Sequence, residues 1–148
     1  MLSLKLKLIM ENDMSNLHGG CMCGEVQFDT TIAPAFAANC HCIDCRQATG
    51  AAYATISFFS TEQVTVTGTS KRFEHSADSG NTLTKHFCGN CGSTLFTSNS
   101  ARDGVLGIMA GVVKNIEDVK PQLNVFVSSK IPSTPLDNSI PAHEKMPS

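Results

Sequence analysis

Seven cysteines in a chain of 148 residues constrain its fold more than any other feature of the sequence. They lie in three tight groups: Cys21 and Cys23; Cys40, Cys42 and Cys45; Cys88 and Cys91. An odd number would leave one thiol over in a closed disulfide framework, and such close spacing suits metal ligation better than disulfides. We therefore expect a reduced, metal-binding chain in the cytoplasm.

Two of the groups are pairs that can each chelate an ion. Between Cys88 and Cys91 a tight turn brings both sulfur atoms to one point, and Gly92 lets the backbone turn closely around them. On an extended backbone, Cys21 and Cys23 point to the same side. A structural zinc takes four ligands, so the two pairs together predict one Cys₄ zinc site. Because the pairs are far apart in the chain, zinc there would contribute to the folding free energy.

The remaining group, Cys40, Cys42 and Cys45, supplies only three thiolates. Three protein ligands and one open position are typical of a catalytic or ligand-exchanging zinc. A thiol that entered the open position would be held as a nucleophilic thiolate, and Arg46 could supply a nearby positive charge. We therefore predict a second, open zinc, with these three cysteines and Arg46 as candidate catalytic residues. The alternatives are an empty or oxidised site, and for Arg46 an ordinary solvated side chain.

Short runs of apolar and β-branched residues predict a mainly β fold, a small antiparallel sheet structure with one short helical turn. The expected strands cover residues 26–32, 51–59, 64–68, 70–75, 81–87, 94–98, 104–113 and 123–129. The helical turn is expected at 44–49, with Gly50 as its stop. We predict one zinc-binding domain over 17–130, a flexible leader or extra strand over 1–16, and an irregular tail over 131–148.

Charge and hydropathy exclude several classes of function. The net charge is -2, and no basic stripe of the kind that nucleic-acid binders carry is present. No apolar run approaches the roughly 20 residues of a membrane span. Lys71, Arg72 and Lys85 could attract an anionic peptide, or could simply solubilise the predicted hairpin. The open position of the predicted second zinc makes a small-molecule thiol the expected partner, and a homodimer is a further expectation.

Two other sets of residues give expectations of their own. His41, between two candidate ligands, should point away from them and face solvent or support them from outside. The phenylalanines are expected in the core, with one as a candidate pocket wall; they are Phe58, Phe59, Phe87 and Phe96.

Three segments, GGCMCGEVQF, CHCIDCRQATGA and FCGNCGSTLF, resemble in this order the motifs of the glutathione-dependent formaldehyde-activating enzymes, a family that includes centromere protein V. The resemblance covers residues 17–129. It implies a small, mostly antiparallel β fold of the kind shared with a Rab-binding guanine-nucleotide release factor. It also implies a structural zinc on Cys21, Cys23, Cys88 and Cys91 and a second zinc on Cys40, Cys42 and Cys45.

The activity that the resemblance implies joins formaldehyde to glutathione and gives S-hydroxymethylglutathione, a carbon–sulfur lyase reaction in reverse. Arg46 would neutralise developing charge or hold a carboxylate of glutathione, and Thr49 and Gly50 would shape the pocket. Relatives often carry an aromatic residue after a Ser-Lys-x-Pro motif, whereas this chain has Ser133 and Thr134 there, which favours a different ligand contact. The alternative is a non-catalytic zinc module that binds a protein partner or a thiol metabolite.

Overall fold

The computed structural model describes residues 15–147 and contains ten strands and one α-helix. The strands are β1 (His18–Gly20), β2 (Gln27–Thr30), β3 (Phe36–Cys40), β4 (Ala54–Ser60), β5 (Val64–Thr67), β6 (Lys71–Ser76), β7 (Thr82–Phe87), β8 (Thr94–Asn99), β9 (Val105–Met109) and β10 (Leu123–Val125). The helix, α2, spans Ile43–Thr49. The prediction of a mainly β fold with one short helical turn is confirmed.

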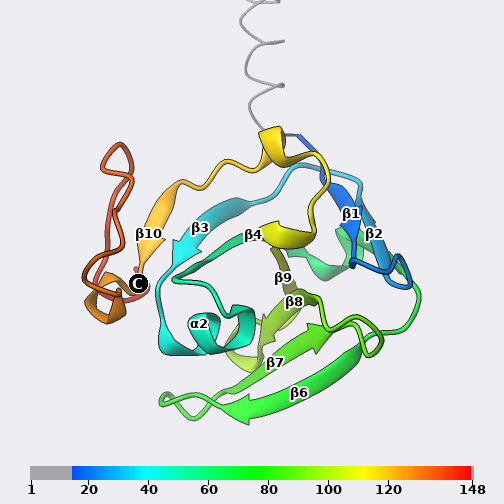
Figure 1. The fold of residues 1–148 in the computed structure, drawn as a ribbon, viewed down its shortest axis with the longest axis horizontal. Helices are drawn as coiled ribbons and strands as arrows, with labels where there is room; N and C mark the ends of the chain where they lie inside the picture. The colour runs from blue at the N-terminus through cyan, green and yellow to red at the C-terminus, as the bar shows by residue number, and fades with distance from the viewer. Residues whose placement is uncertain (1–14, 148) are drawn as a thin grey trace, which may run out of the picture.

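The strands form two sheets. The larger has the order β10-β3-β4-β9-β8-β7-β6, and the smaller has the order β1-β2-β5. In Figure 1 the larger sheet curves, and α2 is seen between β4 and the β6–β7 hairpin. Neighbouring strands are antiparallel, as predicted, except that β10 runs parallel to β3. The chain leaves β9 near the middle of the sheet and crosses to its far edge, and this long connection permits the parallel pairing.

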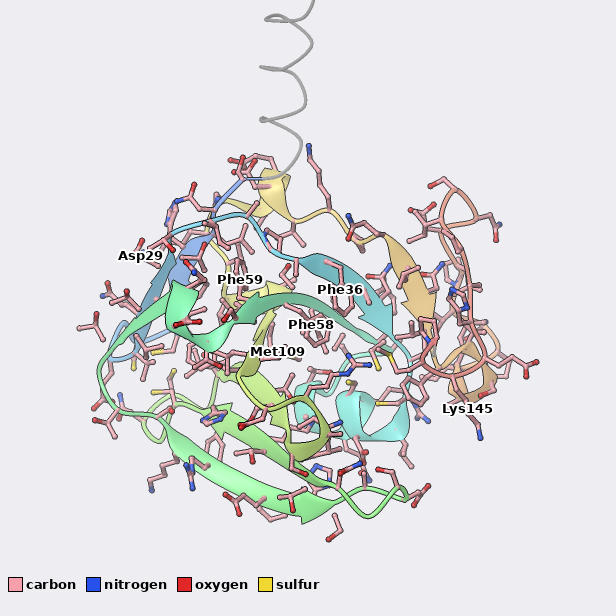
Figure 2. The ribbon with its side chains drawn as sticks, turned by 180° about the vertical axis from the view of Figure 1, so that it is seen from behind. Asp29, Phe36, Phe58, Phe59, Met109 and Lys145 are labelled. Carbon is pink, nitrogen blue, oxygen red and sulfur yellow. The ribbon has the colours of Figure 1, made fainter. Side chains whose placement is uncertain are left out.

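The core lies between the two sheets. Phe28 of β2 and Phe96 of β8 meet edge to face, with ring centroids 5.8 Å apart. The central strand β4 is covered on both faces, since Ile56 and Phe59 are both buried although they point to opposite sides. Phe58, expected to point inward, is half-buried and stacks on Phe36 with ring centroids 4.6 Å apart. Figure 2 shows Phe36 and Phe58 close together at the inner strands of the sheet.

Several predicted strands end earlier than expected. The apolar run over 104–113 forms β9 only as far as Met109, after which Ala110–Val112 form a 3₁₀ turn. The last strand stops at Val125, because Phe126 adopts a left-handed conformation (φ 55°) and begins another 3₁₀ turn. Strand β3 was not predicted, because its small residues give a weak strand signal.

The two terminal segments were predicted to be a leader or extra strand and an irregular tail. The predicted leader over 1–16 falls almost entirely outside the described residues. Residues 131–147 form turns, and their backbone bonds to β10: the N–H of Asn124 donates to Pro141, and the N–H of His143 donates to Asn124. No helix in the described part of the chain is long and apolar enough to cross a membrane.

Candidate metal centres

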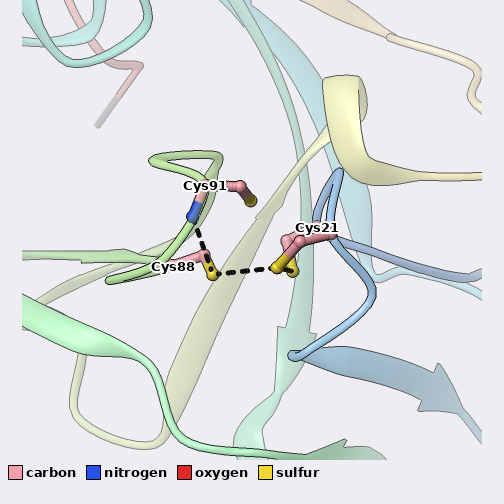
Figure 3. Close-up of side chains that lie close together, drawn as sticks. Cys21, Cys88 and Cys91 are labelled. Carbon is pink, nitrogen blue, oxygen red and sulfur yellow. Dashed lines mark hydrogen bonds between the residues drawn. The ribbon is translucent and has the colours of Figure 1, made fainter.

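The first cysteine cluster contains Cys21, Cys23, Cys88 and Cys91, whose sulfur atoms all lie within 4.8 Å of one another. The sulfurs of Cys21 and Cys23 are 3.6 Å apart, as are those of Cys23 and Cys88. Four thiolates around a zinc ion at about 2.3 Å would be about 3.8 Å apart, so the spacing fits a tetrahedral metal site. Figure 3 shows Cys88 and Cys91 on one loop, facing Cys21 on another.

Two tight loops from different sheets build this cluster. The β1–β2 loop closes where the N–H of Cys21 donates to the carbonyl of Val26 (2.9 Å), and the β7–β8 loop closes where the N–H of Cys88 donates to Ser93 (3.0 Å). Gly92 follows Cys91 with φ 78°, a conformation that favours glycine. The cluster therefore ties the smaller sheet to the larger one.

The thiols of the first cluster differ in acidity. The Ser93 hydroxyl, with backbone N–H groups, lowers the pKa of Cys91 to about 5. Backbone N–H groups of Cys91 and Asn90 donate to Cys88, but burial and the neighbouring thiols outweigh them and raise the pKa of Cys88 to about 11. Without metal, negative charge therefore concentrates on some sulfurs of the cluster, whereas a bound cation would favour the thiolate form of all four.

The second cluster contains Cys40, Cys42 and Cys45, whose sulfur atoms also lie within 4.8 Å of one another. Cys40 ends β3, Cys42 caps the N-terminus of α2, and Cys45 lies in its first turn. The sulfur of Cys42 accepts a hydrogen bond from the backbone N–H of Cys45 (3.3 Å). Among residues 15–147, no further Cys, His, Asp or Glu joins this group. The structure thus assembles the same two sets of cysteines that the sequence grouped.

Electrostatics single out one thiol of the second cluster. Hydrogen bonds from the thiols of Cys40 and Cys45 lower the pKa of Cys42 to about 2, and the backbone N–H of Cys45 and the charge of Lys85 contribute further. The pKa values of Cys40 and Cys45 are raised, mainly by sharing those hydrogen bonds and by burial. In the metal-free cluster the negative charge therefore resides on Cys42.

Helix α2 ends as the sequence predicted. Gly50 adopts φ 71°, and its N–H donates to the carbonyl of Arg46 (2.8 Å). The hydroxyl of Thr94 on β8 donates to the carbonyl of Ala48 (2.7 Å) and holds the helix against the larger sheet. These contacts fix the segment that carries two of the three cysteines.

Two basic side chains lie beside the second cluster in the sequence. His41 is not part of the cluster, and the expectation that it could face solvent is wrong, because it is only 1% exposed and packs on Tyr53 with ring centroids 4.7 Å apart. Its Nδ1 has no hydrogen-bond partner among the described residues, and burial lowers its pKa. The Nε of Arg46 is likewise buried without a partner in the described chain.

Two cavities border α2. One of about 480 Å³, here called the helix-side cavity, lies between α2 and the β6–β7 hairpin and is lined by Asp44, Gln47, Ala48, Phe73, His75, Lys85, Phe87, Gly92 and Thr94. The other, of about 610 Å³, is bordered by Thr49, Tyr53 and Met109 among others. Phe87 is thus a pocket wall. Phe73 was not predicted as a pocket residue, because its only signal is an aromatic side chain in a strand rich in charged residues.

Comparison with known proteins agrees with this arrangement. A family model described as "Glutathione-dependent formaldehyde-activating enzyme" matches residues 16–129, a stretch that includes all seven cysteines. The chain belongs to the glutathione-dependent formaldehyde-activating enzyme family. The resemblance drawn from its three motifs is therefore confirmed, whereas the further likeness to a Rab-binding protein stays a prediction.

Two further comparisons concern curated protein sequences and solved structures. No curated protein sequence matches it significantly. A crystal structure of a Rhodobacter sphaeroides protein is similar, with a TM-score of 0.53 and 18% sequence identity, over 84% of this chain and 98% of that one. At this identity the likeness concerns the fold alone.

Proposed function

We propose that the chain is a zinc-dependent carbon–sulfur lyase that acts on an adduct of a thiol and an aldehyde, such as S-hydroxymethylglutathione. The observation that carries the proposal is the second cluster, in which three thiols converge at the start of α2 and no fourth protein ligand joins them within residues 15–147. The same helix borders a cavity. The family description supports glutathione and formaldehyde as the reactants.

Zinc fits the donor sets of both clusters. Thiolates are soft ligands that zinc accepts in tetrahedral sites, and four of them form a closed structural site. Cys21, Cys23, Cys88 and Cys91 would hold the first ion, and Cys40, Cys42 and Cys45 would hold the second. Bound at the second cluster, zinc would supply Lewis acidity that favours the thiolate form of an incoming thiol.

The proposed reaction balances without any oxidant. The thiolate sulfur of glutathione forms a bond to the carbonyl carbon of formaldehyde, and the proton lost from the thiol is returned to the carbonyl oxygen, which becomes the hydroxyl of the adduct. The reverse reaction breaks the same carbon–sulfur bond. Arg46 is the candidate to offset negative charge on that oxygen, because it follows Cys45 on α2 and its Nε is buried without a partner in the described chain.

A direct experiment measures the exchange between glutathione, formaldehyde and their adduct by NMR, with and without the protein. We expect the protein to accelerate exchange above the spontaneous rate, and zinc analysis under reducing conditions to give both ions per chain. No acceleration at any protein concentration would overturn the enzymatic proposal. Binding of a protein partner that survives Cys42→Ser would then favour the non-catalytic zinc module.

The remaining predictions concern the setting of the protein. We propose a cytoplasmic location, which the seven free cysteines support. A homodimer stays a prediction that the mass of the protein in solution can test.

A further inference from the structure

The helix-side cavity lies within reach of the second cluster. Ala48 lines it, and Ala48 follows Cys45 by three residues on the same helix. Residues three apart on a helix are neighbours at about 5–6 Å. An extended tripeptide spans at most about 11 Å. A thiol peptide whose sulfur meets the second cluster can therefore extend into the cavity.

Two opposite charges line this cavity. Asp44 lies in the first turn of α2, and Lys85 lies on β7 across the cavity. Neither forms an ion pair with any of the residues 15–147, where the recorded pair is Arg72 with Glu74. The Nζ of Lys85 donates a hydrogen bond to the hydroxyl of Thr97 (3.2 Å), which restrains its position. The cavity thus presents one cation and one anion that can bind an outside partner.

Apolar surface accompanies these charges. Phe73 is 61% exposed, and its ring stacks on the His75 imidazole with centroids 5.8 Å apart. Phe87 and Ala48 complete the apolar lining. A ligand with methylene groups next to its charged groups would cover this surface and remove it from water.

We propose that the helix-side cavity binds the γ-glutamyl end of the glutathione substrate, with Lys85 holding its α-carboxylate and Asp44 its α-ammonium group. Phe73 and Phe87 pack against the methylene groups of the same end. The glycine end of glutathione carries a carboxylate but no ammonium group, so it cannot satisfy both charges. This inference rests on the proposed function, since it assumes that the thiol at the second cluster is glutathione.

S-methylglutathione is the probe, because its blocked sulfur cannot ionise or add to an aldehyde. Calorimetry on the zinc-loaded protein measures its dissociation constant for the wild type, Lys85→Gln, Asp44→Asn and the exposed control Lys114→Gln. We expect about a tenfold weaker binding for each cavity variant and no change for the control. An analogue that lacks the α-amino group should bind weakly and should not distinguish Asp44→Asn from the wild type.

The possible outcomes distinguish a failure of the cavity assignment from a failure of the proposed function. Charge-dependent binding of S-methylglutathione without any acceleration of the formaldehyde reaction supports the cavity and defeats the proposed function. Acceleration of the reaction by a protein whose affinity for S-methylglutathione is unaltered by both cavity variants overturns the cavity assignment and leaves the proposed function. Circular dichroism and zinc content establish that each variant is folded and metal-loaded.

Discussion

The two cysteine clusters use the same ligand atom in different structural settings. The first takes its sulfurs from two loops, with Cys23 and Cys88 separated by 65 residues. The second takes all three sulfurs from one short segment, Cys40 to Cys45, at the end of β3 and the start of α2. Closing a long loop restricts the unfolded chain far more than closing a short one. Metal at the first cluster should therefore stabilise the fold, and metal at the second should mainly serve a ligand.

The surroundings of the two cysteine clusters also favour a structural role for the first and a ligand-binding role for the second. The first cluster joins two sheets, and no cysteine of either cluster is among the residues that line the two cavities bordering α2. The second lies on the helix that borders both cavities, and Lys85 links one cavity to Cys42 electrostatically. A set of four cysteines and a set of three thus coexist in one small fold, and these numbers are typical of structural and of ligand-exchanging zinc sites respectively.

The largest expected effect comes from breaking the first cluster. Cys88 is 1% exposed, and Cys88→Ser removes one of four ligands from the site that ties the two sheets. Structural zinc contributes about 10 kcal/mol or more to folding in small domains. We expect the free energy of unfolding to fall by more than about 5 kcal/mol, measured by urea denaturation followed by circular dichroism.

Cys45→Ser is the matched control, because Cys45 is also buried and also belongs to a cluster. It should cost only about 1–3 kcal/mol, the usual range for a buried substitution. Equal destabilisation by the two variants would mean that both metals support the fold, and the contrast between the clusters would be lost.

The next effect separates activity from stability. Cys42 both belongs to the second cluster and caps α2, and serine is a good N-cap, so Cys42→Ser should keep the helix while weakening the metal site. We expect loss of the second zinc, retention of the first, and a fall of about a hundredfold or more in the accelerated exchange rate. Elemental analysis and exchange NMR on the same sample measure both. Unchanged exchange in Cys42→Ser would exclude the second cluster as the reactive site.

Selective release of metal provides a further test of the difference between the two clusters. A mild chelator should strip the second cluster first, after which alkylation should mark Cys42 about tenfold faster than the buried Cys40 and Cys45. Because the pKa of Cys42 lies near 2 rather than 9.0, its thiolate persists and its alkylation rate should stay flat from about pH 8 to about pH 5. The stabilisation that this thiolate gives the fold is fully present above pH 9.0 and declines progressively as the pH falls from 9.0 to about 2. Peptide mapping by mass spectrometry reports the sites, and modification of Cys21 or Cys88 before Cys42 would reverse the predicted order of release.

These clusters could be predicted from the sequence because ligand spacing is a local property. The seven cysteines group in the structure as they do in the sequence, and Gly50 correctly marked the end of α2. β3 and the parallel pairing of β10 could not be predicted, since both depend on which strands meet across the sheet rather than on local pattern. The helix-side cavity was equally hidden, because Asp44 and Phe73 become neighbours only when the β6–β7 hairpin folds beside α2.

His41 had the most misleading local signal, because its position between two ligand cysteines on an extended backbone said nothing about Tyr53. Its ring is buried with an unpartnered Nδ1 among the described residues, so its present contribution is the volume and stacking of the ring rather than a hydrogen bond through that atom. His41→Phe keeps both and should change the free energy of unfolding by less than about 1 kcal/mol, whereas His41→Ala should cost about 2 kcal/mol through the cavity that it leaves. Both variants should retain the first zinc. Loss of the second zinc in His41→Phe alone would show that the imidazole nitrogens, and not only the ring, support the open cluster.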